Sequence, residues 1–133
     1  MRLDKLETGP KADVFLFVRD TERCPAREFL DNCEDRMKKR FRGSFFAATR
    51  EGDAYHNEQR FKPLKGDGKP LWEFKEHDHR IYCYRRRING IGEKMEFILL
   101  CGWVKDKKRG REEDREIQSA KRLLDELLRS EAR

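Results

Sequence analysis

The chain has 133 residues, of which 44% are charged and 36% hydrophobic. Its length suits one domain spanning residues 1–133 and leaves little room for two independent cores. The 32 Lys and Arg residues outnumber the 26 Asp and Glu residues, and the formal charge of +6 favours phosphate polymers or acidic proteins as partners, although a solvated basic surface has the same composition. Because the sequence has neither a cleavable leader nor an apolar run long enough to span a bilayer, it excludes a membrane-spanning class, and we expect a cytoplasmic protein.

The first predicted element is a strand over Ala12–Val18. Residues 1–11 before it are polar, with a break at Gly9-Pro10, and no regular element is predicted there. The strand reads AlaAspValPheLeuPheVal without alternation, which indicates that both of its faces are covered.

A helix is predicted to begin at Pro25. Lysines and arginines between Lys38 and Arg42 suit its C-terminal end, Gly43 is expected to interrupt it, and a short second helix is predicted over 44–50 before a polar stretch. Its apolar stripe has three- and four-residue spacing and comprises Phe29, Leu30, Cys33, Met37 and Phe41.

The second half has a different character. A loop rich in Pro and Gly between Pro63 and Pro70 precedes three predicted strands, joined by turns at His77–His79 and Asn89–Glu93; the strands are Leu71–Glu76, Arg80–Ile88 and Met95–Val104. A charged connector, 105–111, leads to a terminal helix, whose apolar positions are Ile117, Ala120, Leu124, Leu127 and Leu128. The predicted class is therefore α+β, with a small antiparallel sheet of about four strands, the N-terminal helices on one face, and a C-terminal helix.

Several pieces of the second half occur in the order of one known family. They are the Pro-Leu plus Gly-rich loop (Pro63 to Gly68), Leu-Trp-Glu (Leu71 to Glu73), Arg-Ile-x-x-Tyr (Arg80 to Tyr84), Gly-Trp-Val-Lys (Gly102 to Lys105) and Ala120-Lys121-Arg122. With them the chain resembles the RelE/ParE/HigB toxin superfamily, in particular its phage-derived HigB-like branch, whereas the first half agrees only in element order.

The resemblance implies the toxin component of a type II toxin–antitoxin system with a RelE-like fold. Many members are ribosome-dependent endoribonucleases that cut messenger RNA, and each is neutralised by a cognate antitoxin protein. The ParE branch instead poisons DNA gyrase, and the resemblance does not choose between these activities.

Metal-free RNA cleavage needs cations that stabilise added negative charge on phosphorus and a group that accepts a proton from the ribose 2′-hydroxyl. Arg80 matches the family's strand arginine, and its guanidinium can grip a phosphate with two hydrogen bonds; its alternative role is a surface pair with Glu73, Glu76 or Asp78. If Trp72, Phe74, Ile81 and Cys83 face the core, period-two alternation places the candidate residues together on the other face, namely Glu73, Lys75, Arg80, Tyr82 and Tyr84.

Further candidates surround this group. The family carries a basic residue after the last strand, where this chain has Lys105, Lys107, Lys108 and Arg109; a solvated charged loop is the alternative. Tyr82 and Tyr84 could stack a base or pack across strands. Either Glu73 or His79 could accept the proton, and His79 could equally be a turn residue.

No metal or cofactor is expected. His77 and His79 form a His-x-His pair, but the sequence has no CxxC motif and no regular ligand spacing. The cysteines Cys24, Cys33, Cys83 and Cys101 lie among apolar neighbours, so packing is their expected role.

The sequence is also compatible with two alternative functions. One is a non-catalytic or gyrase-directed binding module, favoured if Glu73, Lys75, Arg80 and Lys105 are dispersed in space. The other is a general RNA-binding domain, for which Arg85, Arg86 and Arg87 with two tyrosines would suffice. The sequence leaves the oligomeric state open.

Overall fold

The computed structural model describes residues 1–87, 94–105 and 110–133. Within these ranges the chain forms strands, helices and two short 3₁₀ turns, Gly52–Ala54 and Gly66–Gly68. The order of the main elements is β1 (Arg2–Thr8), β2 (Ala12–Val18), α1 (Pro25–Asn32), α2 (Asp35–Glu51), β3 (Phe61–Pro63), β4 (Trp72–Glu76), β5 (His79–Arg87), β6 (Met95–Val104) and α3 (Gly110–Glu131). The predicted α+β class is confirmed.

The sheet differs from the predicted one in size and direction. It is a six-stranded sheet in the order β1-β2-β6-β5-β4-β3. The β2–β6 pair is parallel, and the other neighbours are antiparallel. The prediction of about four antiparallel strands was wrong because local sequence patterns do not reveal that β2 and β6 lie side by side at the centre.

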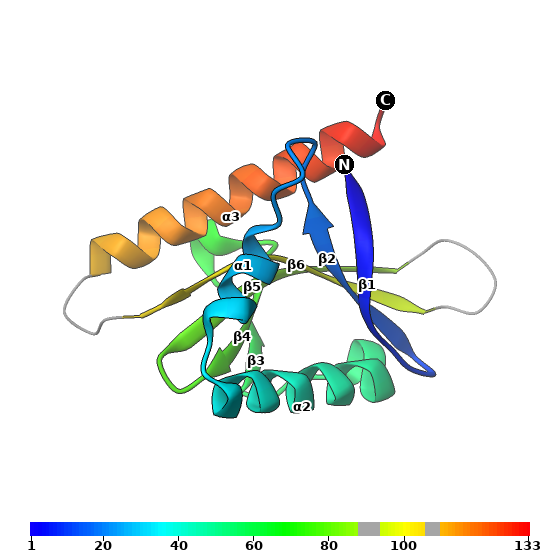
Figure 1. The fold of residues 1–133 in the computed structure, drawn as a ribbon, viewed down its shortest axis with the longest axis vertical. Coiled ribbons are helices and arrows are strands. Elements are labelled where there is room, and N and C mark those ends of the chain that lie inside the picture. The colour runs from blue at the N-terminus through cyan, green and yellow to red at the C-terminus, as the bar shows by residue number, and fades with distance from the viewer. Residues whose placement is uncertain (88–93, 106–109) are drawn as a thin grey trace.

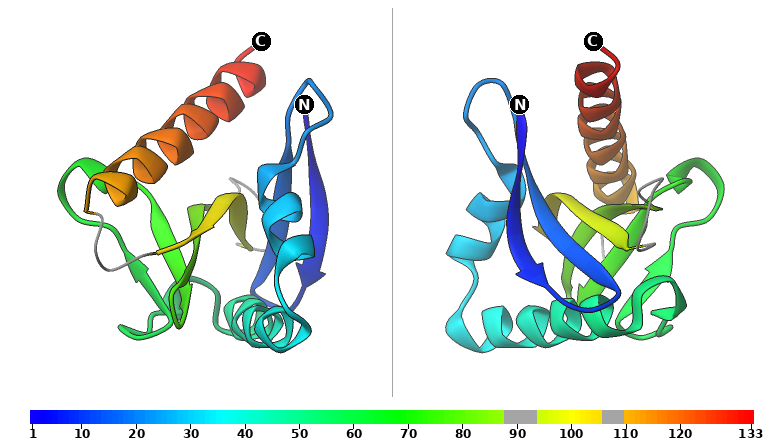
Figure 2. Two further views of the ribbon diagram at one scale, coloured as in Figure 1. Left: turned by 60° about the vertical axis from the view of Figure 1, so that its left-hand side comes forward. Right: turned by 90° about the vertical axis from the view of Figure 1, so that its right-hand side faces the viewer.

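Helices cover both faces of the sheet (Figures 1 and 2). One core cluster joins β2, β4, β5 and β6 to α1 and α2, and a second joins the opposite face to α3. Val14 and Leu16 of β2 belong to the first cluster and Phe17 to the second. The covered faces explain why β2 is apolar except at Asp13, as its lack of alternation predicted.

Two edge strands were missed by the sequence analysis. β1 lies in the polar segment before Ala12 and pairs antiparallel with β2, while the three-residue β3 pairs with β4 at the other edge. Charged residues and short length are typical of edge strands because such edges resist pairing with other chains. These strands therefore lack the apolar alternation on which the prediction relied.

The helix break lies earlier than predicted. Cys33 and Glu34 have extended backbone angles (ψ 150° and 152°) and separate α1 from α2. α2 then continues through Gly43, which was predicted to interrupt the helix. A Cβ at Gly43 would meet nothing within 4 Å, so this glycine lies on an open part of the helix surface, and the hydrogen bonds of a helix can accommodate it at modest cost.

The strands and helix of the second half lie close to their predicted positions. β6 matches exactly, and β4 and β5 differ by a residue at their ends. Ile88 and the predicted turn Asn89–Glu93 lie outside the described residues. In α3, Leu124 and Leu127 are buried as predicted, whereas Leu128 is exposed and Leu123 is buried.

Gly102 of β6 lies directly against Phe29 of α1. A Cβ at Gly102 would be 2.4 Å from the ring of Phe29. Gly102→Ala is therefore expected to lower the free energy of unfolding by about 1–3 kcal/mol. Gly43→Ala is the matched control, and it is expected to raise the free energy of unfolding by up to about 1 kcal/mol. Urea unfolding of both variants measures this, and equal effects would contradict the packing described.

Candidate active site

The strand register places the candidate residues in two adjacent rows on the α3 face of the sheet. Lys62 of β3 is paired with Glu73 of β4, and Glu73 is paired with Tyr82 of β5. In the next row, Lys75 is paired with Arg80. On the other face, Phe74 belongs to the first core cluster and Trp72 packs against it, as alternation along β4 requires.

Arg80 lies at the centre of this group. Its Nε is 3.3 Å from Oε1 of Glu73, and both side chains are largely buried, with 12% and 9% of their areas exposed. Its Nη1 donates to the carbonyl oxygens of His77 (2.6 Å) and His79 (3.0 Å). Of the three carboxylate partners considered for Arg80, Glu73 is therefore the one observed.

The other two carboxylates have different partners. Glu76 is buried and accepts hydrogen bonds from Arg60 on the opposite face, and Asp78 pairs with His79. Arg80 and Glu73 thus form a separate, fixed pair of opposite charges.

Burial and neighbouring charges shift the pKa values of Glu73 and Lys75. Burial raises the pKa of Glu73, and the cations Arg80, Lys75 and Lys62 oppose that change. Burial also lowers the pKa of Lys75, with contributions from Lys62, Arg80 and Lys105. Both shifts bring ionisation closer to neutral pH, which suits groups that transfer protons.

The chain after β6 completes the group. The Nζ of Lys105 is 2.7 Å from Oε2 of Glu113, which lies in the first turn of α3. Glu113 also acts electrostatically on Glu73. We call the set Lys62, Glu73, Lys75, Arg80, Lys105 and Glu113 the β4–β5 cluster. Lys62 and Glu113 were not among the predicted site residues, although Lys62 directly precedes the Pro-Leu plus Gly-rich loop that begins at Pro63.

His79 does not join the β4–β5 cluster. Its ring lies 5.8 Å, centroid to centroid, from that of Phe29 in α1, and its Nδ1 is 2.8 Å from Asp78. Since neighbouring residues of a strand point to opposite faces, His79 and Arg80 are separated by the sheet. Of the two predicted proton acceptors, only Glu73 is in the cluster.

The two tyrosines pack within the α3 side of the sheet. Tyr82 is 1% exposed, and its hydroxyl accepts a hydrogen bond of 3.0 Å from Nε1 of Trp103. Burial raises the pKa of Tyr82. Tyr84 is partly buried against the same core cluster. The prediction that Tyr82 could stack a base was wrong, because its ring is enclosed; the alternative of packing across strands is the one observed.

The arginines of β5 are engaged with carboxylates. Arg86 is bonded to Glu96 (2.7 Å) and to Glu131 (2.5 and 2.6 Å), and these bonds raise the pKa of Arg86. Arg85 and Arg87 both pair with Asp53. Arg86 therefore holds the end of α3 to the sheet instead of presenting a free cation to RNA. Lys107, Lys108 and Arg109 lie outside the described residues.

The cysteines Cys24, Cys33, Cys83 and Cys101 are free and buried. Burial raises the pKa of each thiol, that of Cys101 to about 12, so the reactive thiolate is disfavoured and packing is the role their positions support. Across residues 1–87, 94–105 and 110–133, no three His, Cys, Asp or Glu side chains are grouped to hold a metal ion.

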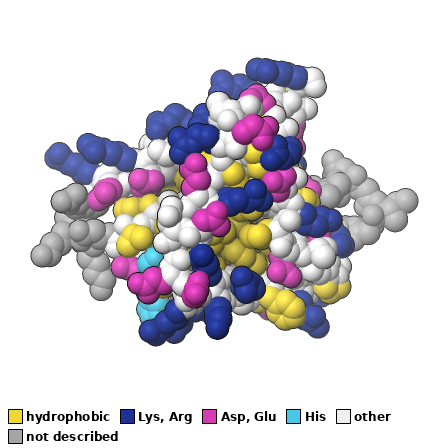
Figure 3. Space-filling model, viewed as in Figure 1, with side chains coloured by type: hydrophobic (Ala, Val, Ile, Leu, Met, Phe, Trp, Pro, Cys, Tyr) yellow, Lys and Arg dark blue, Asp and Glu magenta, His cyan; other side chains and the backbone are white. Residues whose placement is uncertain are grey.

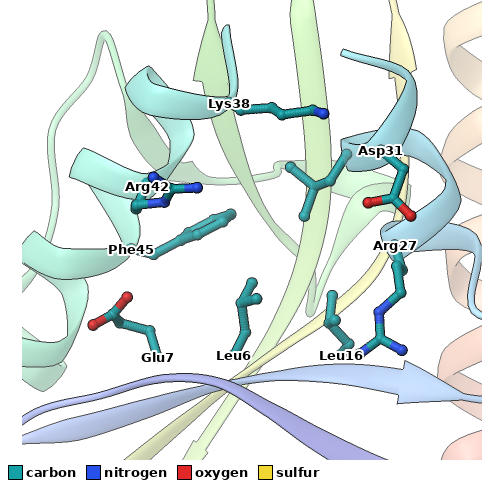
Figure 4. Close-up of a pocket in the computed structure, with 9 residues that line it drawn as sticks. Leu6, Glu7, Leu16, Arg27, Asp31, Lys38, Arg42 and Phe45 are labelled. Carbon is teal, nitrogen blue, oxygen red and sulfur yellow. The ribbon is translucent and has the colours of Figure 1, made fainter. Parts of the chain in front are cut away.

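A hollow of about 190 Å³ lies elsewhere, between β1, α1 and α2 (Figure 4). Its apolar lining comes from Leu6, Leu16, Leu30 and Phe45. Its rim has charges of both signs, from Glu7, Arg27, Asp31, Lys38 and Arg42. The β4–β5 cluster is thus an arrangement on the other face of the sheet and does not coincide with this hollow.

Comparison with family models gave no match to the chain, and comparison with curated proteins found no relative. Among the helices that the structure describes, none combines the length and hydrophobicity needed to cross a bilayer.

Proposed function

We propose that this protein is the toxin of a type II toxin–antitoxin pair and acts as a metal-independent endoribonuclease on messenger RNA at the ribosome. The observation that carries the proposal is the meeting of Glu73, Lys75, Arg80 and Lys105 in the β4–β5 cluster. Glu73 and Lys75 come from β4, Arg80 from β5, and Lys105 from the segment after β6. If these residues had been dispersed in space, a binding role would have been favoured. The element order from β2 to α3, apart from the added β3, also agrees with the RelE-like resemblance.

The cluster contains the groups that the chemistry needs. Glu73 accepts the proton of the ribose 2′-hydroxyl as the 2′-oxygen attacks the adjacent phosphorus atom. Arg80, with Lys62 nearby, stabilises the added negative charge. The bond from phosphorus to the 5′-oxygen breaks, and the Lys75 ammonium donates a proton to that oxygen. The products are a 2′,3′-cyclic phosphate and a 5′-hydroxyl end.

The test is a reconstituted reaction of the purified protein with ribosomes and a defined messenger RNA. We expect internal cleavage that requires ribosomes and gives cyclic phosphate and 5′-hydroxyl ends. Messenger RNA that remains intact, while the protein is folded and the ribosomes translate, would reject the nuclease proposal.

The partners proposed with this function are a cognate antitoxin and ribosome-bound messenger RNA, in the cytoplasm.

A second candidate, a non-catalytic or gyrase-directed module, is favoured by one observation. Within the cluster, the charge of Arg80 is neutralised by Glu73, and that of Lys105 by Glu113. Under this alternative, expression in bacteria arrests growth without new messenger RNA ends, and gyrase supercoiling is inhibited. The general RNA-binding domain is less favoured because Arg85, Arg86 and Arg87 have carboxylate partners.

The raised pKa of Glu73 predicts the pH dependence of cleavage. Glu73 accepts a proton only when ionised, so the rate is low in acid and rises as pH passes through its pKa. Because burial raises that pKa, the rise is expected at higher pH than about 4.3, the value of an exposed glutamate. Single-turnover rates across pH measure this. Glu73→Gln should be slow at every pH, while Glu28→Gln, at an exposed position of α1, should keep the wild-type profile; an unchanged profile in Glu73→Gln would exclude its role.

A further inference from the structure

The outer surface of α2 has a concentration of positive charge that the β4–β5 cluster does not use. Between Arg36 and Arg42 only Met37 and Phe41 are not cationic. Arg36, Lys39 and Arg42 are exposed. Within the described part of the chain, no residue of this run forms an ion pair, whereas arginines on other elements do, such as Arg19 with Glu126. We call Arg36, Lys38, Lys39, Arg40 and Arg42 the α2 basic run.

This arrangement has a cost for the helix. Arg36 is three and four residues from Lys39 and Arg40, and Lys39 is three residues from Arg42, so like charges are neighbours on its surface. Each such pair destabilises a helix by a few tenths of a kcal/mol. A bound polyanion would remove the repulsion and release the counterions that the run otherwise attracts.

The α2 basic run is connected to the β4–β5 cluster around the edge strand β3. Nη2 of Arg60 donates to the carbonyl oxygen of Arg40 at 3.5 Å. The carbonyl oxygen of Arg60 accepts from the backbone N–H of Lys75 at 2.8 Å, across the β3–β4 edge. Lys75 is a member of the cluster, and its Nζ reaches the carbonyl oxygen of Glu58 at 3.4 Å. Arg40, Arg60 and Lys75 therefore follow one another from α2 over this edge to the site, with the guanidinium of Arg60 paired to Glu76.

An exposed aromatic ring lies farther along the same helix. Phe46 is 52% exposed, and the guanidinium of Arg50 lies 5.2 Å from its ring centroid. Figure 3 shows Lys and Arg side chains along the lower margin of the molecule, over α2, with a hydrophobic side chain among them. Cations interleaved with an exposed aromatic are typical of surfaces that bind single-stranded nucleic acid. From Arg36 to Arg50 the helix extends about 21 Å, enough for several nucleotides.

We propose that the outer surface of α2 binds the backbone of single-stranded RNA that continues from the β4–β5 cluster around β3. The identity of the polymer as RNA rests on the proposed function. The surface would hold a flanking segment of the substrate without reading its bases, because its contacts are to phosphates and to the face of any base.

The test uses a fluorescent single-stranded RNA of about 20 nucleotides with 2′-O-methyl riboses, long enough to span the site and α2. This probe lacks the nucleophilic hydroxyl, so binding is measured apart from cleavage. The dissociation constant is determined by anisotropy at several salt concentrations for wild type and for the triple variant Arg36→Gln, Lys39→Gln, Arg42→Gln. Loss of three phosphate contacts is expected to reduce the slope of log K against log salt by about 2.

The matched control removes the same charge from the far part of α3 and the residues after it, with Arg122→Gln, Arg129→Gln and Arg133→Gln. It should keep nearly the wild-type slope. Arg36→Lys with Arg42→Lys should also keep it, and circular dichroism verifies that each variant is folded. If the slope falls equally in the two triple variants, the effect is one of net charge alone. If the slope does not change in the α2 variant, this surface does not bind RNA. Either result overturns the inference.

Two further outcomes separate this inference from the proposed function. RNA binding that depends on α2, in a protein that never cleaves messenger RNA, would keep the surface and reject the nuclease. Normal cleavage by a protein whose RNA binding does not depend on α2 would support the nuclease proposal and reject the α2 surface. If a polyglutamate peptide of equal length binds to α2 as tightly as the RNA does, the surface is one for acidic proteins, and the RNA assignment fails.

Discussion

Replacing Arg80 with alanine is expected to lower the single-turnover rate of messenger RNA cleavage by about 100-fold or more, the usual effect of removing one group that stabilises charge in the transition state. In the structure the Arg80 guanidinium is fixed by Glu73 and by the carbonyl oxygens of His77 and His79. A fixed cation needs little reorganisation when charge develops on the phosphate. Arg80→Lys should retain part of the rate, because an ammonium supplies charge without the two-pronged geometry.

The control for this prediction is Arg23→Ala, since Arg23 is an exposed arginine paired with Glu28 far from the cluster. It should cleave at the wild-type rate. Because Arg80→Ala leaves the buried carboxylate of Glu73 without its partner, the double variant Arg80→Ala, Glu73→Gln is measured by thermal melting to separate loss of folding from loss of chemistry. A folded Arg80→Ala protein that cleaves normally would remove Arg80 from the mechanism.

The largest effect on stability is expected at Phe61. This side chain is fully buried, and its ring centroid lies 4.4 Å from that of Phe74, 4.9 Å from that of Trp72 and 5.0 Å from that of Tyr55. Phe61→Ala should therefore leave a cavity and lower the free energy of unfolding by about 3–5 kcal/mol. For a domain of this size, the melting temperature would fall by about 10 to 20 °C.

Phe46→Ala is the matched control, because it removes the same atoms from a ring that is 52% exposed. Its melting temperature should change by no more than about 2 °C, corresponding to about 0.5 kcal/mol. Differential scanning calorimetry of both variants measures the difference. Similar losses at Phe46 and Phe61 would mean that the aromatic cluster around β3 does not contribute as described.

The parts of the fold that could be predicted have strong local patterns. β2 and β6 are largely apolar runs, and alternation along β4 assigned Glu73 and Lys75 to one face and Trp72 and Phe74 to the other. The turn between β4 and β5 could not be read in the same way. His77 has a positive φ of 53°, and His79 already belongs to β5, so its side chain faces α1 instead of the cluster.

The remaining errors concern contacts between segments distant in sequence. The sequence shows three arginines at Arg85–Arg87 but not that Asp53 and Glu131 lie beside them. The sequence also contains Gly43, but it does not reveal that Phe41 and Phe45, before and after this glycine, both pack α2 into the core. Side-chain pairing and helix continuity were decided by tertiary packing, which outweighs local propensity.

The parallel pair at the centre of the sheet also affects how the protein is made. Ala12 of β2 lies opposite Met95 of β6, so one edge of β2 has no partner until the chain has been synthesised through β6. Nascent chains that stop before β6 would expose that edge and are prone to aggregate. Since Lys105 and Glu113 follow β6, the β4–β5 cluster likewise forms only after these residues have been synthesised.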